Sequence, residues 1–595
     1  MNRIEDYFLI GDLQTAALVS SGGSIDWMCL PYFDSTSIFG RILDENGGTF
    51  SVEMPEYNVA SSYVPETAIV SHKISNENRS FSVKDFMLPK PTSSCRTQLL
   101  VRKIEGLSGS GSVIFRFQPR PEYGKIAADM HQDGSRISFT SGEGRFILFL
   151  PTGTAISRSN GSFLLRIPIG EGESKQLILE HIKKGELSVH PRGDFEKETE
   201  EFWKDWVSKG RFIPESREKL VRSAITLKLM QFYPTGGIVA APTMSLPEQI
   251  GGLRNWDYRY VWVRDSTFIL YALYILGYVD EAMKFFSFIE NVTEFDRESE
   301  HDIQLMYTIH GEHVPEETYL DHLSGYRNSK PVRVGNGAME QFQLDTYGAL
   351  IDAYYFVCSL GAELTDENKK MIRYLLTRIE HLWDEKDNGI WEVRSGKQHY
   401  TYCKVMCWVG VNRALKIHDK IGLKEHEVER YARLEKQIHE WIWENSYDKS
   451  QGILKQYPGT LHMDATNYLF VLFGFLKTSD EKTRKIIEKT ANELVHSDVF
   501  VYRYFSEDGL QGTEGAFLLC TFWYISALAK ICEVKKSAEL FRKVEDLMNK
   551  QGLLAEEIDE KTHEYLGNYP QAFSHIGYIM SAYYIERNKK VSKDL

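Results

Sequence analysis

The sequence predicts a mixed fold in which an N-terminal antiparallel β-sandwich is followed by an all-α (α/α)6 toroid. Between Phe50 and His181, short β-type runs alternate with Gly and Ser turns, which is typical of a sandwich. After Gly193 the chain changes to long amphipathic segments with helical spacing. A chain of 595 residues is too long to fold around one ordinary core. We therefore expect a sandwich domain over 1–193, a helical linker over 194–215 and the large (α/α)6 domain over 216–595.

Six runs in the N-terminal part have the composition of strands. They are 96–104, 112–118, 136–140, 146–151, 162–169 and 176–181. The stretch rich in Gly and Ser around Gly109 is not followed by Gly-Lys-Ser/Thr, which argues against a phosphate-binding loop. We expect a hairpin turn at Gly109 instead. The linker carries Phe202, Trp203 and Trp206 and is expected to be helical.

Twelve segments of the C-terminal part are predicted to be helices. They are 217–232, 266–276, 279–293, 340–359, 367–383, 401–418, 425–445, 464–477, 481–496, 515–533, 536–550 and 570–586. Connections after the odd-numbered segments are long and those after the even-numbered segments are short. If consecutive helices are antiparallel, all six long connections emerge at one end, where we expect a site. An open solenoid is the alternative, but no fixed-period repeat supports it.

Composition excludes several classes of protein. A net charge of −13 disfavours nucleic acid as a partner. The first residues mix charges with apolar side chains and no long apolar run follows, so neither a secretory signal nor a membrane span is expected. Seven scattered cysteines fit reduced thiols in the cytoplasm. Assembly into a homo-oligomer is left open.

The six long connections concentrate aromatic, carboxylate, Arg and amide side chains. They include Trp256, Tyr258, Arg264, Asp265, Asn336, Gln341, Trp391, Glu392, Asp464, Arg503, Glu514 and Glu556. Aromatic rings stack on the apolar faces of sugars, and the polar side chains can hydrogen-bond several hydroxyls, so this mixture suits a carbohydrate pocket. Two carboxylates on different loops of one rim could cleave a glycosidic bond by acid–base catalysis.

These segments resemble glycoside hydrolase family 15, the group of glucoamylases, glucodextranases and prokaryotic trehalases, over almost the whole chain. Gly11-Asp12, Gly22 to Trp27 and Phe33 to Ser35 are similar to the opening of the trehalase-like N-terminal domain found in prokaryotic members. The resemblance implies that Glu392, in a Trp-Glu pair, is the general acid. It also implies that Glu556 is the general base, with Glu557 as the named alternative.

The resemblance further implies a substrate-binding set. Arg264 and Asp265, in a Trp-x-Arg-Asp motif, would hold the hydroxyls of the terminal glucose, and Arg503 would contact the same sugar. The pocket lining and neighbouring binding residues would be Trp256, Tyr258, Trp391 and Lys404. Two positions depart from the pattern, because Cys403 stands where Ser is common and Asn412 where Asp is common.

The resulting hypothesis is an inverting, exo-acting α-glucoside hydrolase that needs no metal or cofactor and releases β-glucose from non-reducing ends. Inversion predicts carboxyl groups about 6.5 to 9.5 Å apart. Glucoamylase-type activity on maltooligosaccharides is placed slightly ahead of trehalase activity. A sugar phosphorylase and a non-catalytic glucan-binding module are the rivals. A zinc site at His301, His310, His313 and His322 is considered and not assigned, because no zinc-binding motif accompanies these residues.

Overall fold

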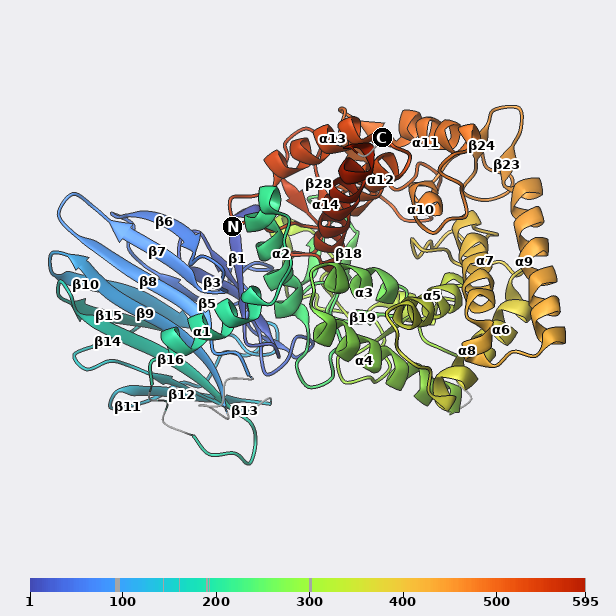
Figure 1. Cartoon of the computed structure of the whole chain (residues 1–595). Coiled ribbons are helices and arrows are strands. Elements are labelled where there is room, and N and C mark those ends of the chain that lie inside the picture. The colour runs from blue at the N-terminus through green and yellow to red at the C-terminus, as the bar shows by residue number, and fades with distance from the viewer. Residues whose placement is uncertain are drawn as a thin grey trace.

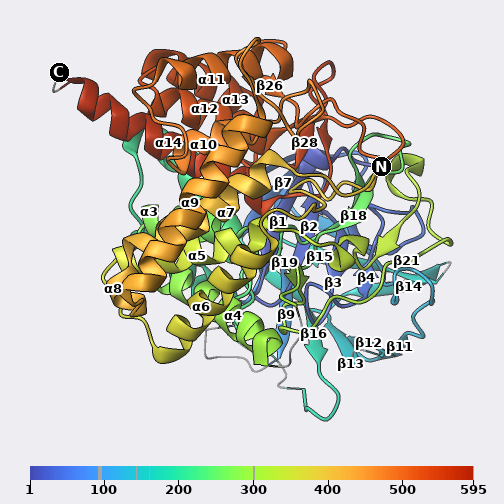
Figure 2. The same cartoon turned by 90° about the vertical axis from the view of Figure 1, so that its right-hand side faces the viewer.

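A computed structural model describes the chain except for residues 91–96, 143, 160, 189–190, 192, 299–301 and 594–595, and leaves out the side chains of 590–593. A strand-rich N-terminal part lies beside a larger helical part (Figure 1). Figure 2 views the molecule from the side of the helical part, where the C-terminal end of the last helix extends beyond its neighbours.

The N-terminal part consists of two large sheets, in which every described strand pair is antiparallel. One has the order β1 (Tyr7–Gly11), β2 (Ala16–Ser20), β3 (Ser24–Cys29), β5 (Thr49–Val52), β10 (Gly111–Gln118), β15 (Ser162–Ile169), β14 (Ala155–Ser159), with β4 (Ser37–Phe39) beside β3. The other has the order β11 (His131–Asp133), β12 (Arg136–Ser141), β13 (Gly144–Phe149), β16 (Ser174–Ile182), β9 (Gln98–Ser108), β8 (Ser80–Met87), β7 (Val70–Ser75), β6 (Asn58–Tyr63). Apolar residues of both sheets share one core, so the arrangement is sandwich-like.

All six predicted strands are present, and the prediction for Gly109 is wrong. Gly109 has a φ of 64° and turns the chain between β9 and β10. These two strands do not pair with each other, because β9 belongs to one sheet and β10 to the other. The turn is therefore a crossing between sheets, which a Gly- and Ser-rich composition does not distinguish from a hairpin. The sequence also gave no indication of the strands β1 to β4 that precede Phe50.

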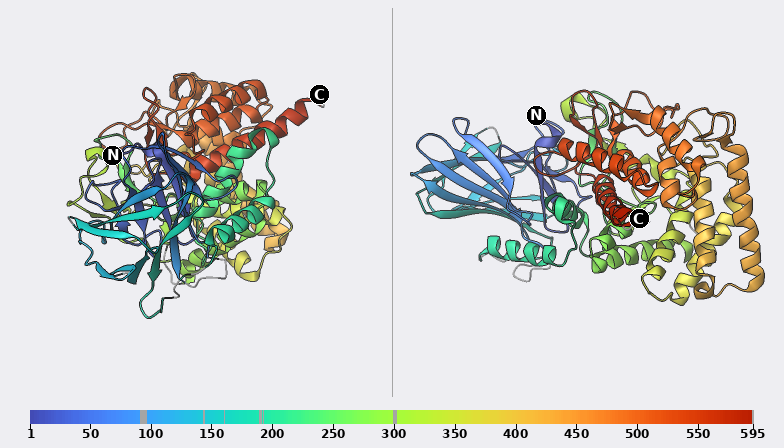
Figure 3. Two further views of the ribbon diagram at one scale, coloured as in Figure 1. Left: turned by 90° about the vertical axis from the view of Figure 1, so that its left-hand side faces the viewer. Right: turned by 45° about the horizontal axis from the view of Figure 1, so that its top comes forward.

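The linker forms α1 (Phe195–Ser208), which lies along the sandwich (Figure 3). Glu196 of α1 pairs with Lys84 of β8 at 2.5 Å. Trp206 stacks on Tyr278 of the helical part with 3.9 Å between ring centroids. The helix α1 thus contacts both parts, the sandwich through Glu196 and the helical part through Trp206.

Each of the twelve predicted helical segments contains a helix. The helices are α2 (Arg217–Met230), α3 (Ser266–Ile275), α4 (Val279–Glu298), α5 (Asp345–Ser359), α6 (Asp366–Leu382), α7 (Thr401–Lys416), α9 (Glu425–Asn445), α10 (Asn467–Leu472), α11 (Glu481–Leu494), α12 (Leu518–Lys530), α13 (Val534–Leu547) and α14 (Ala572–Lys593), with a short α8 (His418–Ile421) between α7 and α9. None of the described helices is both long and apolar enough to span a membrane.

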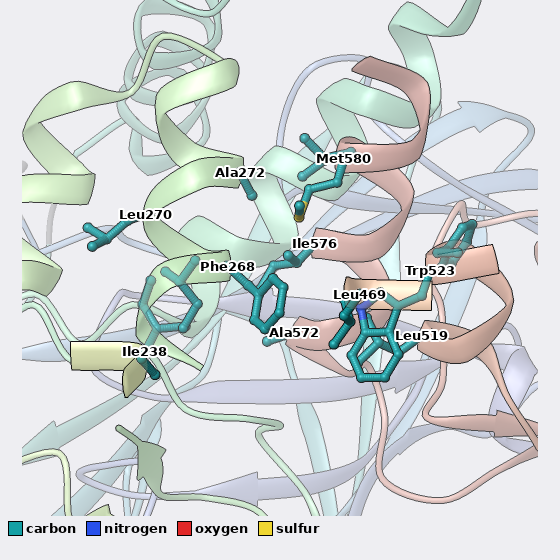
Figure 4. Packing of buried hydrophobic residues seen from close by; sticks show 14 of the residues in the cluster. Ile238, Phe268, Leu270, Ala272, Leu469, Leu519, Trp523, Ala572, Ile576 and Met580 are labelled. Atoms are coloured by element: carbon teal, nitrogen blue, oxygen red, sulfur yellow. The ribbon is translucent and has the colours of Figure 1, made fainter. Parts of the chain in front are cut away.

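Helices that follow one another along the chain also follow one another in space (Figure 1). Alternate helices of the series also contact one another: α3 contacts α5, α5 contacts α7, α10 contacts α12, α12 contacts α14 and α14 contacts α3. Arg413 of α7 donates to the carbonyl of Phe473 after α10 at 2.8 Å. Figure 4 shows how apolar residues of α3, α12 and α14, among them Phe268, Trp523 and Ile576, pack together in the core.

Candidate active site

One cavity enclosing about 820 Å³, part of it open to solvent, lies where the long connections meet. Five of the six long connections contribute to its lining. Eight of the nine predicted site residues line it, namely Glu392, Glu556, Arg264, Asp265, Trp256, Tyr258, Trp391 and Arg503. Lining residues to which the family resemblance assigned no individual role include Glu248, Arg254, Trp262, Asn336, Arg394, Tyr504, Trp523 and Gln571. The alternation of long and short connections therefore located the site.

Glu392 lies on the connection between α6 and α7 in a left-handed backbone conformation, with a φ of 58°. Such a conformation costs a non-glycine residue about 1 to 2 kcal/mol, and residues under backbone strain of this kind are enriched at functional sites. Trp262 donates its indole N–H to Oε1 of Glu392 at 2.8 Å, and the Arg264 guanidinium lies 3.5 Å from the same oxygen. The side chain is 22% exposed. Glu392 is therefore oriented by two donors and still faces the open cavity.

Glu556 is fully buried on the connection between α13 and α14. The Tyr258 hydroxyl donates to its Oε1 at 2.7 Å, and the backbone N–H of Asn568 donates to its Oε2 at 3.3 Å. Burial and the nearby Glu248 carboxylate raise the pKa of Glu556, while the hydrogen bond from Tyr258 lowers it. Gly567 is required here, because a Cβ at that position would lie 2.3 Å from Oε2 of Glu556.

Glu557, the named alternative for the base, is turned away from the cavity lining. Its Oε2 accepts from the backbone N–H of Gly515 at 2.7 Å, and its Oε1 lies 3.7 Å from Arg503. It belongs to β28 (Glu557–Ile558), which pairs with β27 (Ala516–Phe517) and β29 (Tyr565–Leu566). Successive side chains of a strand point to opposite faces, so only Glu556 of the two reaches the cavity. This geometry favours Glu556.

Arg264 and Asp265 form a buried pair on the inner wall. Nε of Arg264 lies 3.3 Å from Oδ1 of Asp265, and its Nη1 donates to the carbonyl of Ile390 at 2.7 Å. Burial raises the pKa of Asp265 to about 7, against the opposing effect of the Arg264 charge. The two side chains thus place hydrogen-bond donors and acceptors on the cavity wall, as recognition of sugar hydroxyls requires.

A second buried network forms another wall around Arg503. Its guanidinium contacts Oε2 of Glu248 at 3.2 Å and donates to Glu514. Glu248 also accepts the indole N–H of Trp256 at 2.8 Å, and Arg254 pairs with Asp508 at 2.8 Å. Sequence reasoning missed Glu248, although it lies on the first long connection, just before the aromatic-rich stretch that begins near Trp256.

The two predicted tryptophans are both fixed by hydrogen bonds. The Trp391 indole N–H donates to Asp464 at 2.9 Å, which brings in the connection between α9 and α10, the one long connection with no described residue in the cavity lining. The Trp391 ring lies 5.8 Å from Trp523 and 5.6 Å from the Arg503 guanidinium. Fixed aromatic faces of this kind are suited to stack on a sugar ring.

The structure does not bring Lys404 to the cavity. Its side chain is fully buried and its ammonium donates to the carbonyl of Glu385. The prediction that it binds substrate is therefore not supported, because the helix α7 turns this residue into the interior. Asn412, the other departure from the family pattern, donates to Glu435 at 2.7 Å on the side of α7 that faces α9.

Asp345, Asp387 and Cys403 place side-chain atoms within 4.8 Å of one another behind the site. Burial raises the pKa of Asp345 to about 6 and that of Asp387 to about 7. Burial therefore favours the neutral forms of both carboxyl groups relative to exposed ones.

The histidines considered for zinc are used separately. His313 contacts Asp296 at 2.9 Å, and His322 contacts the carbonyl of Tyr123 at 2.9 Å. His310 packs against the ring of Tyr32, whereas His301 lies outside the described residues. The three described histidines thus do not converge on one ion.

Comparisons with known proteins identify the family of the chain. The family model "Glycosyl hydrolases family 15" matches residues 214–583, and "Trehalase-like, N-terminal" matches residues 1–162. A protein of Mycolicibacterium smegmatis named trehalase is 34% identical over 98% of this chain and 91% of its own length. A trehalase of Thermoplasma volcanium is 31% identical over 99% and 95%, respectively.

Among solved structures, a bacterial glucoamylase complexed with acarbose has the same fold. Its TM-score is 0.73 and its identity 12%, with 98% of this chain and 94% of that chain covered. The residues that the family model matches include all the connections that line the cavity. The chain belongs to glycosyl hydrolases family 15 and carries a trehalase-like N-terminal domain.

Proposed function

We propose that this protein is an inverting hydrolase of α,α-trehalose, with Glu392 as general acid and Glu556 as general base. The observation that carries the proposal is the pair of carboxylates in one cavity, each held by its own donor. Trp262 orients Glu392 at 2.8 Å and Tyr258 orients Glu556 at 2.7 Å. The rings of Trp262 and Tyr258 are themselves in contact, with centroids 5.4 Å apart, so one rigid unit supports both carboxylates.

In the proposed reaction, one glucose ring occupies the closed end of the cavity beside Arg264 and Asp265. Glu392 gives its proton to the glycosidic oxygen as the bond from the anomeric carbon to that oxygen breaks. Glu556 takes a proton from the water that attacks the same carbon from the opposite face. The products are one β-glucose and one α-glucose, and proton transfer through bulk solvent returns both carboxyl groups to their starting states.

The choice of trehalose reverses the preference that the sequence alone suggested. Full-length relatives from bacteria and archaea carry the name trehalase, whereas the glucoamylase likeness is one of fold alone. We also propose that the twelve helices close into an (α/α)6 toroid around the cavity. Residues 1–193, 194–215 and 216–595 would be the sandwich, linker and catalytic domains. The cytoplasm remains the proposed location, because the six described cysteines are unbonded.

A phosphorylase is the less favoured reading. The two buried arginines among the proposed sugar-binding residues are already paired with carboxylates, which makes them poor ligands for phosphate. Arg264 pairs with Asp265, and Arg503 pairs with Glu248 and Glu514. In a phosphorylase, phosphate takes the place of the base, but here the carboxylate of Glu556 occupies that position.

The test is glucose release from trehalose and from maltotriose, with the anomers followed by NMR at early times. Equal amounts of α- and β-glucose from trehalose support the proposal. β-Glucose from maltotriose, with trehalose untouched, would instead establish a glucoamylase-type enzyme. Glucose 1-phosphate that appears only when phosphate is added would establish a phosphorylase.

A further inference from the structure

At the mouth of the cavity lies an arginine whose guanidinium has no hydrogen-bond acceptor among the described residues. Arg394 lines the cavity, and its side chain is 35% exposed, against 22% for Glu392 and 8% for Arg264. This gradient places Arg394 toward the solvent side. Among the described residues no acceptor lies within hydrogen-bond distance of its guanidinium, and its nearest carboxylate oxygen belongs to Glu317 at 3.6 Å.

The Arg394 guanidinium is nevertheless held in place. It lies over the Trp256 ring at 4.6 Å from the centroid, and Arg333 lies over a Trp256 face at 4.5 Å. Glu317 accepts from Nε of Arg333 at 3.0 Å and from the backbone N–H of Gly337 at 3.1 Å. The backbone N–H of Arg394 donates to the carbonyl of Asp508 at 2.9 Å. A positioned cation with unused donors is prepared for a ligand.

Glu317 and Arg333 both come from the long connection between α4 and α5. This connection does not supply either proposed catalytic carboxylate. It fixes the rim around Trp256 and Arg394, where the part of the substrate beyond the scissile bond must lie. Arg394 lies two residues after Glu392 on the same connection. Its side chain is nevertheless positioned by residues of the connection between α4 and α5.

We propose that Arg394 binds the hydroxyls of the leaving-group sugar, and that Glu317 is a positioning residue that keeps Arg394 on the rim. The inference rests on the proposed function. A planar guanidinium can donate to two neighbouring acceptors at once. The second glucose of trehalose offers adjacent hydroxyls beside the oxygen that Glu392 protonates. The site thus selects α-glucosides whose leaving group is itself a sugar.

The test compares trehalose with α-glucosyl fluoride, whose leaving group has no hydroxyls. In Arg394→Met, which keeps an unbranched stem beside Trp256 and removes the donors, the ratio of kcat/KM for trehalose to kcat/KM for the fluoride should fall about 10- to 100-fold. Glu317→Gln should lower the same ratio by a smaller factor. Lys397→Gln, a change on the same loop outside the cavity lining, should leave the ratio at the wild-type value.

The outcomes separate the two proposals. Wild-type enzyme that hydrolyses both substrates, with an unchanged ratio in Arg394→Met, would overturn the role of Arg394 alone. Equal losses on the two substrates in Arg394→Met would also overturn it, because a general disturbance of the site would explain them. Wild-type enzyme that hydrolyses neither substrate would refute the proposed function and this inference with it.

Discussion

Tyr258→Phe removes one hydroxyl from the site and keeps the ring that packs on Trp262. That hydroxyl donates to Glu556 at 2.7 Å and lowers the pKa of Glu556, which burial raises. A hydrogen bond to a charged group contributes about 1.5 to 3 kcal/mol, or roughly 10- to 100-fold in an equilibrium or rate constant. Since the base acts in its ionised form, its activity is lost as pH falls through its pKa. Without the hydrogen bond, the pKa rises and this loss begins at higher pH.

The assay is the pH profile of kcat/KM for glucose release from trehalose. Below the acid limb we expect Tyr258→Phe to lose about 10- to 100-fold in kcat/KM, and well above it the loss should shrink. Tyr260→Phe is the matched control, because the Tyr260 hydroxyl contacts Asp257 at 3.4 Å and lies outside the cavity lining. A loss in Tyr258→Phe that is the same at every pH would refute the reasoning, since it would show that the hydroxyl does not act through the ionisation of Glu556.

Three further changes test other parts of the structure. Glu392→Gln should lower kcat on trehalose by about 10²- to 10⁴-fold and affect α-glucosyl fluoride much less, because fluoride needs no proton to leave; equal losses would argue against a general acid. Arg259→Met should destabilise the protein by about 3 to 5 kcal/mol, because it leaves the fully buried Asp257 without its partner at 2.7 Å; an unchanged melting temperature would contradict this. Cys403→Ser should change the free energy of unfolding by only about 1 kcal/mol in either direction, because the hydroxyl can donate toward Asp345, whose Oδ2 has no described partner; a denaturant titration that gives a loss of several kcal/mol would show that the thiol is required.

The helices were predictable because their signals are local. Apolar spacing at a period of 3.6 residues located all twelve helices. The predicted and observed bounds differ where residues of a segment serve the site instead of continuing the helix. The segment 464–477 forms helix only over Asn467–Leu472. Asp464 instead accepts hydrogen bonds from Trp391 and Gln456, and Gly474 has a φ of 80°, which ends the helical path. The spacing of apolar residues contains no information on such hydrogen bonds or on a glycine with positive φ.

The site was predictable in part for a different reason. Eight residues on long connections were brought together as the alternation of connection lengths implied. Lys404 was misplaced because its position on α7 depends on how that helix is rotated against its neighbours. Glu248 was not identified and Arg394 was given no role, because their contacts are with residues distant in sequence, Arg503 and Glu317 respectively. Such contacts are set by tertiary packing and not by local pattern.

The support for the base side of the cavity depends on the N-terminal part in the same way. Arg259, next to Tyr258 in the chain, pairs with Asp257 and donates to the carbonyl of Ser35 at 2.9 Å. The Tyr569 hydroxyl, just after Asn568, donates to the carbonyl of Tyr7 at 2.7 Å. Both residues that hold Glu556 are therefore adjacent to residues anchored on the sandwich. The sandwich is thus part of the framework that positions Glu556, the proposed base, and changes at this contact should alter the acid limb of the pH profile as well as stability.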